Sequence, residues 1–151
     1  MNKCNAQKVY GIDLGSTYSA IAAVNEEGQA EIVPNADGDR KTASAVFFEP
    51  SDEQCKPNVI VGQVAKEVSC TDPEHFVDFV KCHMGDSCWN REIEGISWTP
   101  EMISAAIIKK LVKGVEYRDA IDAVEQVKDV VITCPAYFND AQRCATRFAR
   151  H

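Results

Sequence analysis

The feature that most constrains the fold is a long helix pattern that leads into a continuous apolar strand late in the chain. A helix is predicted to begin at Thr99-Pro100-Glu101, which combines a capping hydroxyl, a first-turn proline and an acidic residue. Its buried stripe is predicted to hold Ile103, Ala106, Ile107 and Leu111. The strand is predicted over Val127–Thr133, where an uninterrupted apolar run is typical of burial on both faces. A helix that returns to a buried strand indicates an α/β sheet.

Three strands are predicted to precede this helix in a β-meander, at Lys8–Asp13, Tyr18–Val24 and Gln29–Val33. The turns between them carry Gly or Asn, residues that favour tight chain reversal. The run Pro34–Asp39 breaks the pattern and is interpreted as a domain boundary. After the late strand, Asn139 and Gln142 form a plausible capping pair for a last helix that is expected to reach Arg150.

The segment between the boundary and the long helix is less regular and is predicted to form an inserted subdomain. Short strands are expected at Ala45–Glu49 and Asn58–Val61, followed by a helix over Gly62–Ser69. A second helix is expected to start at Asp72-Pro73-Glu74 and to run from His75 to Met84. The stretch from about Arg40 to Ser97 is therefore interpreted as a subdomain inserted into the first domain.

Composition favours a globular protein and argues against some function classes. The chain has 151 residues, of which 45% are hydrophobic and 26% charged, and its formal net charge is −7. This charge argues against a nucleic-acid interface, which needs a clustered basic surface. No apolar run reaches membrane-spanning length, so no membrane contact is expected.

The cysteines predict a reducing compartment. There are seven of them, an odd number, and no Cys-x-x-Cys pair occurs. We interpret them as reduced thiols of a cytoplasmic protein without a secretory signal. Cys82, His83 and Cys88 match no familiar zinc spacing and are expected to be unrelated side chains.

The run from Tyr10 to Ser19 has the residue order of a turn that wraps a phosphate. A strand ends at Asp13, a carboxylate that could hold Mg²⁺ through water, because Mg²⁺ keeps much of its hydration shell. Gly15 permits backbone angles that would let N–H groups converge on an anion, and Ser16 and Thr17 add hydroxyl donors. An ordinary hairpin turn has the same composition. The phosphate interpretation gains support because Asp13 and Pro135 both follow strands of the predicted sheet, where ligands gather.

Several motifs resemble those of one protein family. The run from Val130 to Arg143, which reads Val-Val-Ile-Thr-Cys-Pro-Ala-Tyr-Phe-Asn-Asp-Ala-Gln-Arg, closely resembles a signature in the ATPase domain of Hsp70 chaperones. Gly11 to Ser19 is similar to that family's first phosphate loop, which actin and sugar kinases share. Phe76–Lys81 and Thr99–Ser104 also fit, and the motifs occur in the family's order from Val9 to Ala145.

The resemblance implies a fold, cofactors and residue roles. The fold would be an actin-like ATPase fold, in which residues 1–36 and 99–151 form an incomplete ribonuclease-H-like half-lobe and residues 37–98 a small inserted α+β subdomain. The cofactors would be ATP or ADP and Mg²⁺. Asp13 matches the aspartate on the Mg²⁺ side, and Lys81 matches the catalytic lysine that positions or activates the attacking water. Pro135 and Arg143 match an allosteric switch that relays nucleotide state. The loop around the β- and γ-phosphates is matched by Gly15, Ser16, Thr17 and Tyr18.

The chain departs from the family pattern at a few positions. Ser16 stands where the family usually has Thr, and Cys134 where it usually has Val. Cys82 and His83 follow Lys81 in place of the usual Arg and aliphatic residue. The second phosphate loop, the adenosine pocket and the peptide-binding domain would lie beyond His151, so the chain is expected to be a fragment, a truncated product or an independently expressed half-lobe.

Three functions are therefore weighed. The first is the N-terminal part of an Hsp70-type ATPase domain, whose intact form would bind unfolded peptides, a J-domain co-chaperone and a nucleotide-exchange factor. The second is a non-catalytic interaction fragment, and the third a sugar or acetate kinase of the actin-like group. With half of the phosphate cage absent, residues 1–151 alone are expected to hydrolyse little ATP and to bind nucleotide weakly. Self-association is also expected, because an open edge along Val127–Thr133 invites strand pairing.

Overall fold

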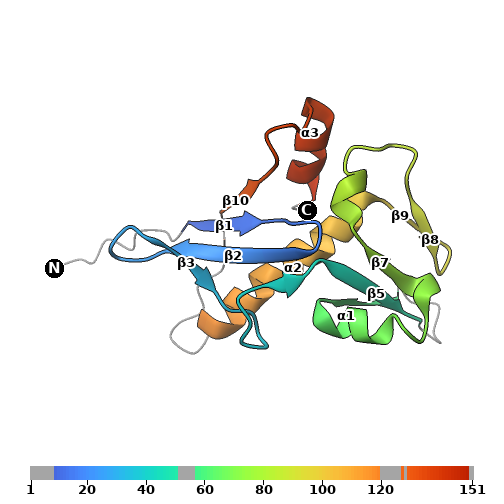
Figure 1. Cartoon of the computed structure of the whole chain (residues 1–151), viewed down its shortest axis with the longest axis horizontal. Helices are drawn as coiled ribbons and strands as arrows, with labels where there is room; N and C mark the ends of the chain where they lie inside the picture. Colours follow the sequence, from blue (N-terminus) through green and yellow to red (C-terminus); the bar gives the residue numbers. More distant parts are fainter. Residues whose placement is uncertain (1–8, 51–56, 120–126, 128, 150–151) are drawn as a thin grey trace.

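The computed structural model describes residues 9–50, 57–119, 127 and 129–149, and it has mixed α/β architecture (Figure 1). The large sheet has the strand order β10-β1-β2-β3, with the short strand β4 beside β3 on the same edge of β2. The central pair β1 and β2 is antiparallel, whereas β1 and β10 run parallel. The bounds are β1 Tyr10–Asp13, β2 Tyr18–Val24, β3 Ala30–Val33, β4 Thr42–Ala43 and β10 Val130–Thr133. The expected meander and the return to a parallel strand are thus confirmed.

A smaller antiparallel sheet with the order β6-β5-β7 follows directly from β4 along the chain. Its central strand is buried on both faces: Val46 and Phe48 belong to the main core, and Ala45 and Phe47 pack near the short helix α1. A separate hairpin of β8 and β9 stands beside this sheet. The bounds are β5 Ala45–Glu49, β6 Asn58–Val61, α1 Gln63–Val68, β7 Phe76–Asp78, β8 Arg91–Ile93 and β9 Ile96–Trp98.

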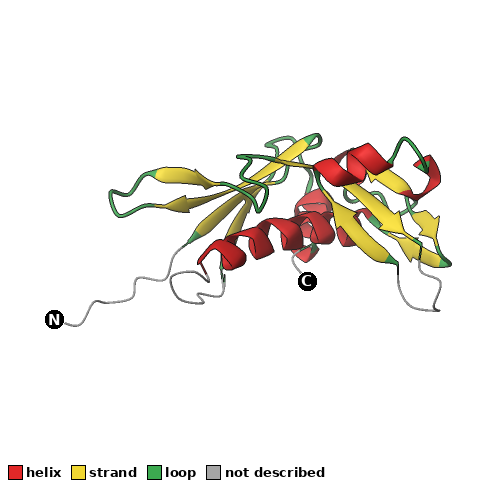
Figure 2. Ribbon diagram, turned by 90° about the horizontal axis from the view of Figure 1, so that it is seen from below, coloured by secondary structure: helices red, strands yellow, loops and turns green. Residues whose placement is uncertain are grey.

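Helix α2, Pro100–Asp119, connects the two sheets by packing against both (Figures 1 and 2). The helix begins as predicted, since the Thr99 hydroxyl accepts a hydrogen bond from the Met102 amide at 3.3 Å. It contacts β2 of the large sheet and β5 and β6 of the small one. One continuous core therefore joins the sheets, and the helix contributes Ile103, Ile107, Ile108, Leu111 and Val115 to it.

Helix α3, Asp140–Phe148, starts with the predicted capping box. The Asn139 side chain accepts from the Gln142 amide at 2.9 Å, and the Gln142 side chain accepts from the Asn139 amide at 3.0 Å. Reciprocal bonds of this kind satisfy amides that the first helical turn leaves without partners. The expected last residue of this helix, Arg150, lies outside the described residues.

The predicted helix from His75 to Met84 is wrong. The chain forms a 3₁₀ turn, η1 Pro73–His75, then strand β7, then a second 3₁₀ turn, η2 Val80–His83. Phe79 adopts φ 51°, a left-handed conformation that interrupts any α-helix at this position. Pairing of β7 with β5 outweighs the local helical spacing of the apolar residues.

Burial of the late strand on both faces is also wrong for the described part of the chain. The Val131 side chain is 60% exposed, whereas Val130 and Ile132 pack against the core. Within the described residues, β10 is an outer strand of the sheet and pairs only with β1. The apolar run therefore presents one hydrophobic face and one backbone edge to solvent.

Candidate functional site

Asp13 and Thr133 meet where the parallel strands β1 and β10 end side by side. The two residues are direct partners in the strand register, and the Thr133 hydroxyl donates to Asp13 Oδ1 at 3.0 Å. Asp13 remains exposed, so its carboxylate is oriented by the neighbouring strand yet open to a ligand. The position of Asp13 at the end of a strand was predicted from the sequence, but Thr133 was not, although the two residues lie directly opposite each other in the parallel pair.

The loop of residues 15–18, hereafter the Gly15–Tyr18 loop, requires a glycine for reasons of space. A Cβ atom built on Gly15 would lie 2.0 Å from the Tyr18 carbonyl oxygen, far inside any tolerated contact. Gly15 is not among the residues with positive φ, so the predicted need for special backbone angles is wrong. The chain reverses so tightly here that only hydrogen fits between the two ends of the loop.

The amides of this loop point in different directions. The Gly15 N–H donates to the Ser19 hydroxyl at 3.2 Å, so this amide is used inside the protein and is not aimed at a ligand. The Thr17 carbonyl accepts from the Ser44 amide at 2.9 Å. Within the described residues, the amides of Ser16 and Thr17 have no protein acceptor. These two amides, with their neighbouring hydroxyls, are the donors that the loop can offer to an anion.

Tyr18 lies at the end of the loop under two lysines that the sequence did not single out. Lys41 Nζ is 4.1 Å and Lys66 Nζ 4.9 Å from the centroid of the Tyr18 ring. Lys41 follows the turn before β4, and Lys66 belongs to α1, so the lysines reach the ring from separate segments. Their charges raise the electrostatic potential at the rim of the loop.

Lys81 lies in η2 and is half-buried. Its Nζ is 5.9 Å from the centroid of the Phe138 ring, which is itself buried in the core. Phe138 belongs to the connection between β10 and α3, and the same connection begins just after Thr133. Contacts through β10 and this connection therefore link Asp13 with Lys81, although Asp13 ends a strand of the large sheet and Lys81 lies in η2.

Pro135 and Arg143 are brought together by backbone contacts in the β10–α3 connection. The Pro135 carbonyl accepts from the Phe138 amide at 3.1 Å and closes a turn. Arg143 Nε donates to the Phe138 carbonyl at 3.0 Å, and its Nη2 donates to the Ala136 carbonyl at 3.2 Å. The guanidinium thus fixes the turn that carries the aromatic neighbour of Lys81.

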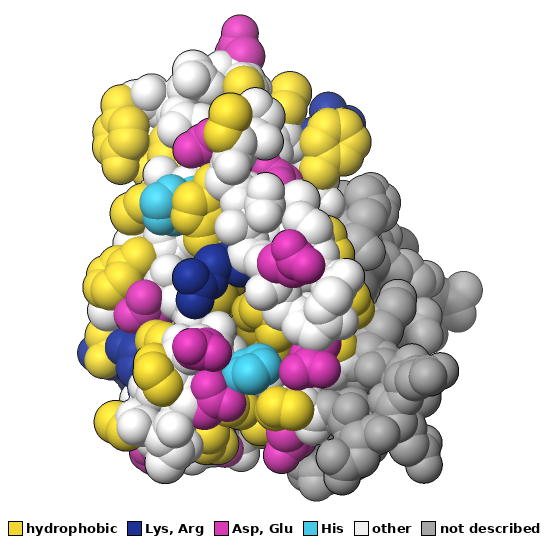
Figure 3. All heavy atoms as spheres, turned by 90° about the vertical axis from the view of Figure 1, so that its right-hand side faces the viewer, with side chains coloured by type: hydrophobic (Ala, Val, Ile, Leu, Met, Phe, Trp, Pro, Cys, Tyr) yellow, Lys and Arg dark blue, Asp and Glu magenta, His cyan; other side chains and the backbone are white. Residues whose placement is uncertain are grey.

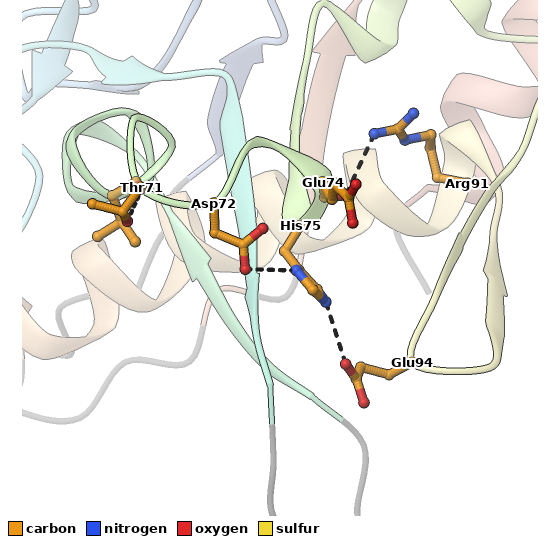
Figure 4. A network of polar contacts seen from close by, with 7 residues as sticks. Thr71, Asp72, Glu74, His75, Arg91 and Glu94 are labelled. Atoms are coloured by element: carbon orange, nitrogen blue, oxygen red, sulfur yellow. Dashed lines mark hydrogen bonds and ion pairs between the residues drawn. The ribbon is translucent and has the colours of Figure 1, made fainter.

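The titrating groups with a perturbed pKa lie away from these residues (Figure 4). The pKa of His75 is raised, first by its 2.8 Å hydrogen bond to Asp72 and next by the 3.2 Å contact with Glu94. The pKa of Asp72 is lowered chiefly by the same bond to His75. The imidazole connects η1 with the β8–β9 turn and has a structural role in the small sheet.

The described residues contain no cluster of three His, Cys, Asp or Glu side chains suited to a metal ion. His83, which the sequence placed between Cys82 and Cys88, stacks on Trp89 with ring centroids 4.7 Å apart. On the face drawn in Figure 3, basic side chains stand apart from one another among acidic and hydrophobic ones. None of the helices in the described part of the chain combines the length and apolarity needed to cross a bilayer.

Comparison with known proteins gives a consistent set of relatives. Residues 9–95 and 86–151 match a family model described as "Hsp70 protein". The chain is 44% identical over 142 residues to "Chaperone protein DnaK" of Thermotoga neapolitana, and the match covers 93% of this chain and 22% of that relative. A protein of the same description from Thermotoga petrophila is 43% identical with the same coverage. The chain therefore spans about a fifth of the length of these curated relatives.

Proposed function

The chain belongs to the Hsp70 family, and from this premise we propose that it is the N-terminal part of the ATP-binding and ATP-hydrolysing domain of a DnaK-type chaperone. The observation that supports the proposal is a series of contacts that joins the motif residues. Asp13 accepts from Thr133 at the end of β10, and Lys81 Nζ lies 5.9 Å from the ring centroid of Phe138 in the connection that follows β10. The family match favours this function over a sugar or acetate kinase.

We propose the domain organisation on the same basis. The family implies an actin-like ATPase fold, in which residues 1–36 and 99–151 would supply the first part of a ribonuclease-H-like lobe. Residues 37–98 would form the inserted subdomain. The direct passage from β4 in the large sheet to β5 in the small sheet supports this division, as does the contact of α2 with both sheets.

The Gly15–Tyr18 loop would hold the β- and γ-phosphates of ATP, or the β-phosphate of ADP. The fit rests on the Ser16 and Thr17 amides, which have no protein acceptor within the described residues. Gly15 permits the tight reversal that presents them, because a Cβ atom there would clash with the Tyr18 carbonyl oxygen. The Ser16 and Thr17 amides and hydroxyls would be the donors. Asp13 would hold Mg²⁺ through water, since one exposed carboxylate suits an ion that keeps most of its hydration shell.

Lys81 would be the catalytic residue of the intact domain. Phosphoryl transfer depends on positioning and on neutralisation of charge more than on covalent chemistry. Lys81 is half-buried, with its Nζ 5.9 Å from the Phe138 ring centroid, and no carboxylate among the described residues forms an ion pair with it, so its charge would be available to the γ-phosphate. Pro135 and Arg143 would act as the allosteric switch, because both fix the turn that carries Phe138.

In the intact protein, the nucleotide state would control the binding of unfolded peptides, with a J-domain protein and a nucleotide-exchange factor as partners, in the cytoplasm. Residues 1–151 alone would hydrolyse little ATP, because donors from only one side of the cleft are present. Effective positioning accounts for roughly 7–11 kcal/mol of a barrier. Steady-state hydrolysis by this chain that Lys81→Ala abolishes would contradict the expectation.

Calorimetric titration of the chain with Mg·ADP tests the proposed binding. We expect weak, saturable binding that Asp13→Asn lowers at least about tenfold, because a hydrogen bond to a charged group contributes roughly 1.5–3 kcal/mol. Glu26→Gln is the matched control, because Glu26 is an exposed acid in the turn between β2 and β3, at the opposite end of β2 from the loop. Equal effects of the two substitutions, or an absence of saturable binding, would overturn the proposal.

A further inference from the structure

We propose that a buried pair of hydroxyl groups, Ser19 and Ser44, positions the Gly15–Tyr18 loop for nucleotide phosphate and ties this loop to the small sheet. The inference rests on the proposed function and assigns a new role to both residues, that of positioning residues that act through the loop. Neither serine is aimed at a ligand. Their side chains are 1% and 2% exposed, so they act from inside the protein.

The first attachment runs through the two side chains. Ser19 Oγ and Ser44 Oγ are 2.8 Å apart, and the Gly15 N–H lies 3.2 Å from Ser19 Oγ. A backbone N–H can only donate, so the Ser19 oxygen accepts from Gly15. The bond between the hydroxyls can run in either direction, and in both cases it fixes the rotamer of Ser19. A chain of polarised hydrogen bonds therefore holds the Gly15 amide away from solvent.

The second attachment runs through the backbone of Ser44. Its amide donates to the Thr17 carbonyl at 2.9 Å. The loop is thus held inward at the Gly15 amide and at the Thr17 carbonyl, on either side of Ser16. With these two groups turned inward, the Ser16 and Thr17 amides are left for an anion. Ser44 contributes to both attachments, to the first through its side chain and to the second through its backbone, so a substitution of its side chain removes the first attachment and leaves the second in place.

The position of Ser44 extends this role beyond the loop. It is the single residue between β4, which pairs with β2 in the large sheet, and β5, the centre of the small sheet. Strand β7 pairs with β5 and leads within two residues to η2, which carries Lys81. A rotation of the small sheet against the large one would therefore act on the loop through Ser44. The geometry points to a mechanical connection between the phosphate-binding loop and the segment that carries the catalytic lysine.

A general loss of stability is the competing explanation for any effect of these serines, and Ser104 provides the matched control. This residue of α2 is also fully buried, and its hydroxyl contacts Met84 Sδ at 3.4 Å. Within the described residues, its hydroxyl forms no hydrogen bond with the loop or with Ser19 and Ser44. Ser104→Ala thus measures the general effect of removing a buried serine hydroxyl that is not hydrogen-bonded to the loop.

The test measures amide hydrogen exchange at Gly15 and Mg·ADP affinity in the same set of variants. Ser44→Ala leaves the direct acceptor of the Gly15 amide in place and removes only the partner of that acceptor. We expect it to speed Gly15 exchange and to weaken Mg·ADP binding about fivefold each, the equivalent of one ordinary hydrogen bond. Ser44→Thr, which keeps the hydroxyl, should restore affinity, and Ser104→Ala should change neither quantity.

The outcomes separate the inference from the function on which it rests. If Ser44→Ala changes Gly15 exchange and nucleotide affinity no more than Ser104→Ala does, the positioning role is overturned. If the wild-type chain fails to bind Mg·ADP but Gly15 exchange responds as expected, the proposed function is overturned and the attachment of the loop is supported. Additive effects of Ser19→Ala and Ser44→Ala in the double variant would contradict their action as a pair.

Discussion

Replacement of Gly15 by alanine is the sharpest perturbation that the structure offers. The added Cβ would lie 2.0 Å from the Tyr18 carbonyl oxygen, whereas close C···O contacts in proteins are about 3.3–3.6 Å. The backbone of the loop must therefore shift by more than about 1 Å. Overpacking of this kind costs roughly 1–3 kcal/mol of unfolding free energy. The shift would also break the hydrogen bond from the Gly15 amide to Ser19 and misplace the neighbouring amides.

Gly11→Ala is the matched control for this variant. Gly11 lies in β1, its φ is not positive, and a Cβ built there meets no atom within 4 Å. This substitution should leave stability unchanged or raise it by about 0.4–1 kcal/mol, because alanine lowers the entropy of the unfolded chain. The unfolding free energies of the two glycine variants are thus expected to differ by roughly 1–4 kcal/mol.

Urea denaturation followed by tryptophan fluorescence measures this difference, because Trp89 and Trp98 both pack against the core. Mg·ADP titration of each folded variant then tests the loop itself. We expect Gly15→Ala to lose both stability and nucleotide binding, and Gly11→Ala to retain both. Equal midpoints for the two variants, or full Mg·ADP affinity in Gly15→Ala, would refute the steric argument.

Three further predictions follow from other parts of the chain. The pKa of His75 is raised in the folded state, so the protonated imidazole stabilises the fold below about pH 6.5, and this contribution is lost as pH rises through the folded pKa. His75→Gln should therefore lower the urea midpoint more at pH 5.5 than at pH 8.5. An equal loss at both pH values would count against a stabilising role of the Asp72 and Glu94 contacts. Asn139→Ala should lower unfolding free energy by about 0.5–2 kcal/mol through loss of the capping box, as measured by urea denaturation, and an unchanged midpoint would show that the cap contributes nothing. Val131→Lys should reduce self-association, as measured by sedimentation velocity, because it places a charge on the exposed face of an outer strand. A wild-type chain that stays monomeric at high concentration would contradict the predicted self-association.

Local sequence patterns predicted the structure correctly where interactions between residues close in the sequence determine it. Strand β2 has the predicted bounds Tyr18–Val24, because polar turn residues enclose a short apolar run. The Asn139 capping box was predicted because both of its hydrogen bonds join residues three positions apart. The segment from His75 to Met84 could not be predicted in this way. Its apolar spacing suits a helix, and only the pairing of β7 with the distant strand β5 makes it extended.

The same distinction applies to the candidate site. Asp13 and Lys81 were predicted as site residues through motifs that a short stretch of sequence carries. Their contacts with Thr133 and Phe138 depend on how the late strand returns beside β1, which no local pattern reveals. Ser44 was not predicted for the same reason, because its contact with Ser19 joins residues that lie far apart in the sequence.

The central claim is that the Gly15–Tyr18 loop and Lys81 serve one nucleotide site, and paramagnetic broadening by Mn·ADP tests it most directly. Manganese bound in place of magnesium should broaden the amide signals of Asp13 to Tyr18 first, then those of Thr133 and of the residues around Lys81. Signals from the exposed lysines of α2, Lys109 and Lys113, should stay sharp. Broadening centred on α2, or broadening at Asp13 that leaves the surroundings of Lys81 unaffected at saturation, would contradict the account.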